Sequence, residues 1–117
     1  MARINYVELP ARDVAAAKRF YAEVFGWDLT DFGPDYAATM TGDVDLGLNG
    51  VAEQATKAPL AVIDVADLEA YLAKVEAAGA RITQPIFAFP GGRRFHFLDP
   101  NDNELAVVQN DPPEAHA

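Results

Sequence analysis

The chain has 117 residues, which is enough for one compact domain and too short for two ordinary ones. Half of the residues are hydrophobic and 23% are charged, a composition typical of a globular protein. Eighteen acidic against nine basic residues give a net charge of −9, which argues against nucleic acid or an anionic membrane as a partner. The absence of cysteine excludes disulfides, thiol nucleophiles and thiolate metal sites.

The sequence also lacks the signals of export and membrane insertion. No apolar run approaches the roughly 18 residues of a membrane span, and the N-terminal residues lack the apolar segment of a secretory signal. We therefore expect a small, acidic, soluble protein of the cytoplasm.

Taken in chain order, the predicted elements form the same series twice. In the first half we expect a strand, a helix and three short strands, at 4–9, 14–24, 27–31, 36–41 and 44–49. In the second half we expect the same order, at 60–65, 68–78, 81–89 (interrupted at Pro85), 93–98 and 104–109. Each half is therefore a β-α-β-β-β module.

The start and stop signals of the two helices support this repeat. Asp13 and Asp67 are good N-caps, because a carboxylate accepts hydrogen bonds from the first backbone N–H groups of a helix. Gly26 and Gly79 suit the left-handed residue after a helix end. The aspartates are 54 positions apart and the glycines 53, so the two modules keep nearly the same phase.

The whole chain, 1–117, is expected to be a single domain. The first module covers about residues 3–50 and the second about residues 59–109. A polar linker at 51–58 joins them, and residues 110–117 form a tail that cannot continue a strand because of its prolines.

Two segments carry a resemblance to a known family. Residues 13–27 read DVAAAKRFYAEVFGW, and residues 97–105 read FLDPNDNEL. In this order, and with the repeat, they resemble the first helix and the last hairpin of the vicinal oxygen chelate superfamily, the glyoxalase/bleomycin-resistance/dioxygenase group. The hairpin departs from the family pattern at Asp102, where glycine is common. The resemblance extends from about Ile4 to Val108.

The resemblance implies an α+β fold in which the two modules form an open barrel-like cup with the helices outside. Such a cup usually holds a small molecule, and we expect a homodimer. The cup forms either within one chain or between swapped modules, and the sequence does not choose between them. Metal-dependent members bind a divalent cation that substrate oxygens chelate and that acts as a Lewis acid or activates dioxygen.

The positions that bear metal ligands in such members are altered here. The place of the family's first histidine, seven residues before Asp13, is Tyr6, and its counterpart in the second module is Leu60. The place of the last glutamate, seven residues after Asp99, is Ala106. Leucine and alanine offer no donor atom, so we expect no metal cofactor. A shifted site built from Glu8, Glu104 and His96 is an alternative, although it lies one strand repeat, roughly 7 Å, away.

If the cup is a pocket, the resemblance places two residues in its wall, and strand alternation adds two more on the same faces, with His96 and Tyr36 as further candidates. The predicted ligand-binding residues are Tyr6, Glu8, Tyr36, His96, Glu104 and Ala106. His96 could serve as a general acid or base, but spacing identifies no partner carboxylate for it. No residue is assigned to catalysis.

The remaining aromatic and basic residues could have either a structural role or a role in ligand binding. The aromatic cluster at the end of the first helix is expected in the core: Phe20, Tyr21, Phe25 and Trp27. Phe87, Phe89 and Phe95 lie on strands, where they could equally face the core or the ligand. Arg93 and Arg94 could meet an anionic ligand, but a solvated strand face or an ion pair is the expected environment.

Three functions remain. We favour a metal-independent member that binds a small, partly apolar organic compound and is not an enzyme. The first alternative is a metal-dependent lyase, isomerase or dioxygenase with non-standard ligands. The second is a structural or regulatory dimer with a filled cup. The fold alone does not fix the chemistry, because this superfamily hosts several reactions.

Overall fold

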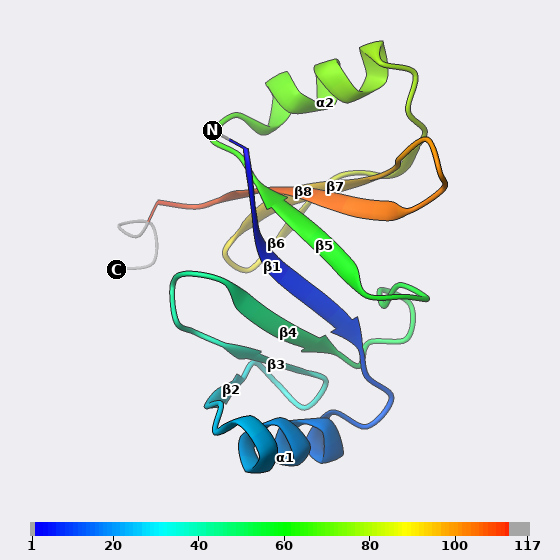
Figure 1. Ribbon diagram of the computed structural model, residues 1–117. Coiled ribbons are helices and arrows are strands. Elements are labelled where there is room, and N and C mark those ends of the chain that lie inside the picture. Colours follow the sequence, from blue (N-terminus) through cyan, green and yellow to red (C-terminus); the bar gives the residue numbers. More distant parts are fainter. Residues whose placement is uncertain (1, 113–117) are drawn as a thin grey trace. The chain divides into compact units, whose positions relative to one another are not determined.

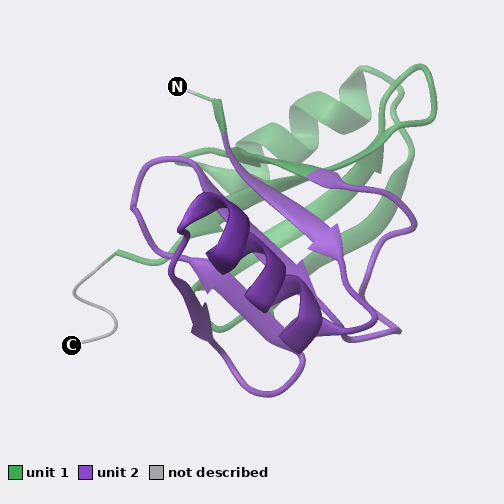
Figure 2. Cartoon of the chain, turned by 60° about the horizontal axis from the view of Figure 1, so that its bottom comes forward, with its two compact units in different colours: residues 1–4, 61–117 green, residues 5–60 purple. Residues whose placement is uncertain are grey.

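A computed structural model of the chain describes residues 2–112. They divide into two compact units, which Figure 2 shows in different colours. The N-terminal unit comprises residues 5–60, and the described part of the C-terminal unit comprises residues 61–112 together with residues 2–4. The part of the predicted tail from residue 113 onward lies outside the described residues.

The N-terminal unit contains one helix and a four-stranded sheet (Figure 1). Its elements are β1 (Arg3–Pro10), α1 (Val14–Phe25), β2 (Leu29–Asp31), β3 (Tyr36–Thr39) and β4 (Asp45–Asn49). The strand order is β2-β3-β4-β1. The pair β1–β4 is parallel, whereas β2–β3 and β3–β4 are antiparallel.

The C-terminal unit repeats this arrangement. Its elements are β5 (Leu60–Asp64), α2 (Leu68–Ala77), β6 (Ile82–Phe89), β7 (Gly92–Leu98) and β8 (Glu104–Asn110). The order is β5-β8-β7-β6, with β5 and β8 parallel and the other pairs antiparallel. The expected α+β fold of two tandem β-α-β-β-β modules is therefore confirmed.

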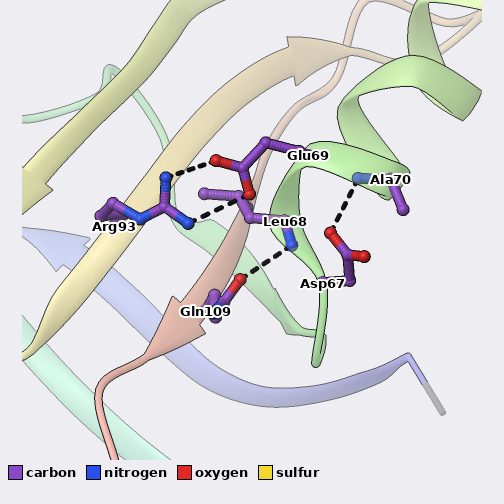
Figure 3. A network of polar contacts seen from close by, with 6 residues as sticks. All are labelled: Asp67, Leu68, Glu69, Ala70, Arg93 and Gln109. Carbon is purple, nitrogen blue, oxygen red and sulfur yellow. Dashed lines mark hydrogen bonds and ion pairs between the residues drawn. The ribbon is translucent and has the colours of Figure 1, made fainter.

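The predicted caps form as expected. Asp13 accepts a hydrogen bond from the backbone N–H of Ala16 at 2.9 Å, and Gly26 ends α1 in the left-handed conformation with φ 71°. Asp67 accepts from Ala70 at 3.1 Å (Figure 3). Gly79, with φ 87°, follows the end of α2. Neither helix of the described residues is long and apolar enough to cross a membrane.

The core of the N-terminal unit lies between α1 and one face of its sheet. Its buried residues are Val14, Leu29, Ala37 and Leu48. Because side chains alternate along a strand, the neighbours of Ala37 and Leu48 point to the face opposite α1. The polar candidates Tyr36 and Glu8 lie on that opposite face.

The core of the C-terminal unit lies in the same way beneath α2. Its buried residues are Val65, Leu68, Phe95 and Val107. The backbone N–H of Leu68 donates to Oε1 of Gln109 at 2.9 Å, which ties the start of α2 to β8 (Figure 3). The strand neighbours of Phe95 and Val107, which include His96 and Ala106, point to the face opposite α2.

The prediction that the aromatic residues at the end of α1 are core residues is wrong for three of them. Phe20, Phe25 and Trp27 are 53%, 55% and 41% exposed, and only Tyr21 packs against the core. The rings stack on one another instead, with centroids 5.5 Å apart for Tyr21–Trp27 and 5.1 Å for Phe25–Trp27. The rings therefore cover part of one another's surface instead of packing into the core.

Pro85 does not interrupt its strand, contrary to the prediction. It lies within β6, which is the outer strand of the C-terminal unit's own set of four. An outer strand tolerates a missing backbone N–H. The pairing between β6 and β7 shifts register on both sides of Gln84, so the strand continues through an irregularity.

The turn between β7 and β8 explains the departure at Asp102. Asp99 accepts hydrogen bonds from the side-chain amide and backbone N–H of Asn103 and from the backbone N–H of Asn101, which lower the pKa of its carboxyl. Asp102 has φ 64°, the left-handed conformation in which glycine is common. The turn delivers Glu104 as the first residue of β8.

Candidate functional site

Three of the predicted site residues meet on the N-terminal unit's sheet, on the face opposite α1. The hydroxyl oxygens of Tyr6 and Tyr36 lie 2.6 Å apart, and the Tyr36 hydroxyl donates to Oε2 of Glu8 at 3.0 Å. Oε1 of Glu8 accepts from the side-chain amide of Asn49 at 3.1 Å. Glu8 is only 3% exposed, so its carboxylate is held by protein groups instead of bulk water.

The direction of these hydrogen bonds follows from the number of hydrogens available. A tyrosine hydroxyl carries a single hydrogen, and that of Tyr36 is directed to Glu8. The hydrogen between the two tyrosines must therefore come from Tyr6. The result is a directed chain from Tyr6 through Tyr36 to the Glu8 carboxylate.

The electrostatics of this chain keep Tyr36 neutral. Burial, followed by the nearby Glu8 carboxylate, raises the pKa of the Tyr36 hydroxyl far above its ordinary value of 10.0. Tyr36 is therefore a hydrogen-bond donor and not a nucleophile or base near neutral pH.

Two participants of this network are absent from the sequence-based prediction. Asn49 fixes the second oxygen of Glu8, and its own amide oxygen accepts from the backbone N–H of Val51 at 3.0 Å. A Cβ at Gly47 would overlap the hydroxyls of both Tyr6 and Tyr36, so only glycine leaves them room. The one available signal for Asn49 was a polar residue at the end of β4, after the run from Leu46 to Leu48.

The other three predicted residues meet on the C-terminal unit's sheet, on the face opposite α2. His96 is 1% exposed, and its Nδ1 lies 2.9 Å from Oε2 of Glu104. A carboxylate can only accept hydrogen bonds, so Nδ1 carries the hydrogen. Ala106 is fully buried and pairs with His96 across β7 and β8.

Glu104 is thus the partner carboxylate that spacing did not identify. The link requires β7 and β8 to fold back on each other through the turn at Asp99, which sequence spacing alone does not reveal. The Thr83 hydroxyl donates to the same Oε2 at 3.1 Å, and the ring of Phe87 lies 5.8 Å from that of His96. The sequence analysis missed Thr83 and left open which face of the sheet bears Phe87.

The strand aromatics divide between the two faces. Phe95 is fully buried in the core beneath α2. Phe87 lies on the face that bears His96, as its pairing with Arg94 requires.

Two surface hollows lie elsewhere in the N-terminal unit. One of about 350 Å³ is formed at the start of α1 by residues that include Leu9, Asp13 and Tyr21. The other, of about 310 Å³, lies beside Trp27 and Val44. None of the six predicted site residues lines either hollow, so we do not assign ligand binding to them.

Comparison with known proteins gives a family for this fold. Residues 3–107 match the model of the Glyoxalase/Bleomycin resistance protein/Dioxygenase superfamily. The chain belongs to this superfamily. The match includes every predicted site residue, and it confirms the resemblance drawn from the two sequence segments.

Two curated proteins are similar in sequence to most of this chain. Proteins of Mycobacterium bovis and Mycobacterium tuberculosis, named "Putative glyoxylase CFP32", are 31% identical over 90% of this chain. The chain spans 44% of the length of these curated relatives.

Solved structures of the superfamily share the fold. Methylmalonyl-CoA epimerase from Mycobacterium tuberculosis has a TM-score of 0.74 at 17% identity, covering 97% of this chain and 91% of its own. The Mn(II)-bound glyoxalase from Novosphingobium aromaticivorans has a TM-score of 0.67 at 23% identity, covering 93% of this chain and 40% of its own. At these identities the likeness shows the fold alone.

The residues at the superfamily's metal positions do not fit a metal ion. Leu60 and Ala106 are fully buried and provide no donor atom, and the Tyr6 hydroxyl is engaged by Tyr36. Both oxygens of Glu8 accept hydrogen bonds, and Oε2 of Glu104 accepts two. Among the described residues, no group of three or more His, Cys, Asp or Glu side chains is arranged to hold a metal.

Proposed function

We propose that this superfamily member binds a small, partly apolar organic ligand without a resident metal ion. A ligand would contact the sheet face opposite the helix of a unit. That face bears Tyr6, Glu8 and Tyr36 in the N-terminal unit and His96, Glu104 and Ala106 in the C-terminal unit. The observation that carries the proposal is the buried chain of hydrogen bonds from Tyr6 through Tyr36 to Glu8.

The energetics of this chain support binding over a purely structural role. Removing a carboxylate such as that of Glu8 from water costs several kcal/mol, on the order of the whole gain from its partners. Well-packed apolar residues of similar volume would stabilise a small module as well or better. Convergent polar groups in a buried environment are typical of ligand sites.

The altered donor set supports metal independence. The superfamily's ligand positions hold Leu60 and Ala106, which provide no donors. The alternative is a metal-dependent lyase, isomerase or dioxygenase with shifted ligands such as Glu8, Glu104 and His96. It requires the carboxylates to give up their present hydrogen bonds.

The contact between His96 and Glu104 favours a second candidate function, proton transfer to or from a bound ligand. Glu104 fixes the hydrogen on Nδ1, so a neutral imidazole would accept a proton at Nε2. For any compound that binds, the test is exchange of its acidic C–H hydrogens with deuterium in heavy water. His96→Gln should abolish exchange even at ligand concentrations that saturate the variant. Equal exchange with the variant would reject this function.

We also propose that the protein forms a homodimer, as its resemblance to the superfamily implies. Light scattering should give twice the chain mass of 12.6 kDa at micromolar concentration. A single chain mass would reject the dimer, and with it the alternative of a structural or regulatory dimer.

Ligand binding is tested by a thermal-shift screen of small aromatic and oxygenated compounds. Compounds that raise the melting temperature of the wild type should lose that effect with Tyr6→Phe and Glu8→Gln. Tyr71→Phe is the matched control. It also removes a tyrosine hydroxyl, but Tyr71 belongs to α2 and packs against the core, away from the candidate residues. A wild type that responds to no compound would favour the structural alternative.

A further inference from the structure

The two neighbouring arginines of β7 point to opposite faces of the C-terminal unit's sheet. Arg93 faces α2 and forms a bidentate ion pair with Glu69, with N···O distances of 2.5 and 3.1 Å (Figure 3). Its guanidinium is therefore engaged in joining β7 to α2. Arg94 lies on the face that bears His96, two residues further along the strand.

Arg94 is held by two aromatic rings of β6. The centre of its guanidinium lies 5.3 Å from the ring centroid of Phe87 and 5.7 Å from that of Phe89. Phe87 is also the register partner of Arg94, so the contact follows from strand pairing. Contact with the two rings restricts the guanidinium and shields part of it from water.

The same ring connects Arg94 to the pair formed by His96 and Glu104. The Phe87 ring lies 5.8 Å from the His96 ring, whose Nδ1 is fixed by Glu104. A guanidinium and an oriented imidazole thus lie side by side on one sheet face.

We propose that Arg94 binds the anionic group, a carboxylate or a phosphate, of the ligand of the C-terminal sheet face. A guanidinium has five N–H donors, so it can serve ligand oxygens in addition to any protein partner. Its planar fork matches two oxygens of either anion, and such charge-assisted pairs are about twice as strong as neutral ones. This assignment of a ligand class rests on the proposed binding function.

Three probes that share a phenyl ring distinguish binding of a carboxylate, a phosphate and a neutral amide. They are benzoate, phenyl phosphate and benzamide. Their dissociation constants are measured by titration of the arginine Nε–H signals in NMR spectra and by calorimetry. We expect one of the anions to bind at least roughly tenfold more tightly than benzamide, and more weakly as salt increases. The comparison of benzoate with phenyl phosphate tells which anion the site prefers.

Substitutions of Arg93 and Arg94 distinguish the roles of the two arginines. Arg94→Met keeps an apolar stem between the Phe rings and should remove the preference for the anion. Arg93→Met, its matched control, removes an exposed ion pair and should leave the preference intact. Melting curves establish that both variants fold. The comparison of the three probes on the wild type needs no variant.

Two results would overturn the proposal while leaving a binding function in place. One is benzamide binding as tightly as both anions, and the other is equal loss of anion binding in the two variants. Failure of all three probes, and of every compound in the wider screen, would reject the binding function together with this proposal.

Discussion

The hydroxyl oxygens of Tyr6 and Tyr36 lie 2.6 Å apart at a position that a side chain on Gly47 would occupy. The two tyrosines come from β1 and β3, which are not adjacent in the sheet, and β4 lies between them. They can meet only because the intervening strand has no Cβ there. A glycine in a strand ordinarily weakens it, and here it makes the hydrogen-bonded chain to Glu8 possible.

Gly47→Ala should therefore destabilise the protein by about 1–3 kcal/mol, the usual range for inserting atoms into a packed site. Urea unfolding measures the change. In the background of Tyr6→Phe and Tyr36→Phe the penalty should shrink, because the two hydroxyls that the new methyl group meets are gone. An equal penalty in both backgrounds would show that the hydroxyls do not set the constraint.

The second prediction concerns alkaline pH. Burial and the Glu8 carboxylate raise the pKa of Tyr36 above its ordinary 10.0, so the folded state keeps a proton that the unfolded state loses. This contribution to stability is complete below pH 10 and declines as the pH rises above it. Unfolding free energies measured from pH 8 to 11 should fall less steeply for Tyr36→Phe. Equal slopes would contradict the prediction.

The third prediction concerns the hydrogen on His96. A slowly exchanging Nδ1–H signal of His96 should be visible by NMR in the wild type, because Glu104 accepts this hydrogen in a buried environment. Glu104→Ala should abolish it. Thr83→Val, which removes another donor to Glu104, should retain it. A signal that survives in Glu104→Ala would mean that Glu104 does not fix the imidazole.

Much of the fold could be predicted because its signals are local. The caps Asp13 and Asp67 act within one helical turn, and the modules repeat with nearly the same phase. The prediction failed where clustering of aromatic residues was taken to mean burial. Phe20 and Phe25 have the chemistry of core residues, but only Tyr21 of this cluster packs against the core.

The candidate site was only partly predictable, for a different reason. Strand alternation correctly placed Glu8 on the side of Tyr6 and Glu104 on the side of Ala106. The contacts themselves depend on strand pairing, which brings residues 28 to 41 positions apart into one network in the N-terminal unit. Single-sequence spacing does not contain that register, so Asn49 and the link from His96 to Glu104 could not be derived.

The fourth prediction uses Ala106. Ala106→Phe should abolish ligand binding, because the new ring would occupy the face opposite α2 where we propose that the ligand binds. Val107→Phe, its strand neighbour in the core beneath α2, should instead lower the melting temperature by several degrees. A comparable fall with Ala106→Phe would indicate a filled core at that position.

The most direct test of the central claim compares ligand binding before and after removal of metal. The protein as isolated is dialysed against a chelator, its content of zinc, iron and manganese is determined, and the affinity for a compound from the screen is measured by calorimetry. We predict no stoichiometric metal and an unchanged affinity after dialysis. Near one metal ion per chain, lost with Glu8→Gln or Glu104→Gln, and binding that only the returned metal restores would contradict the account.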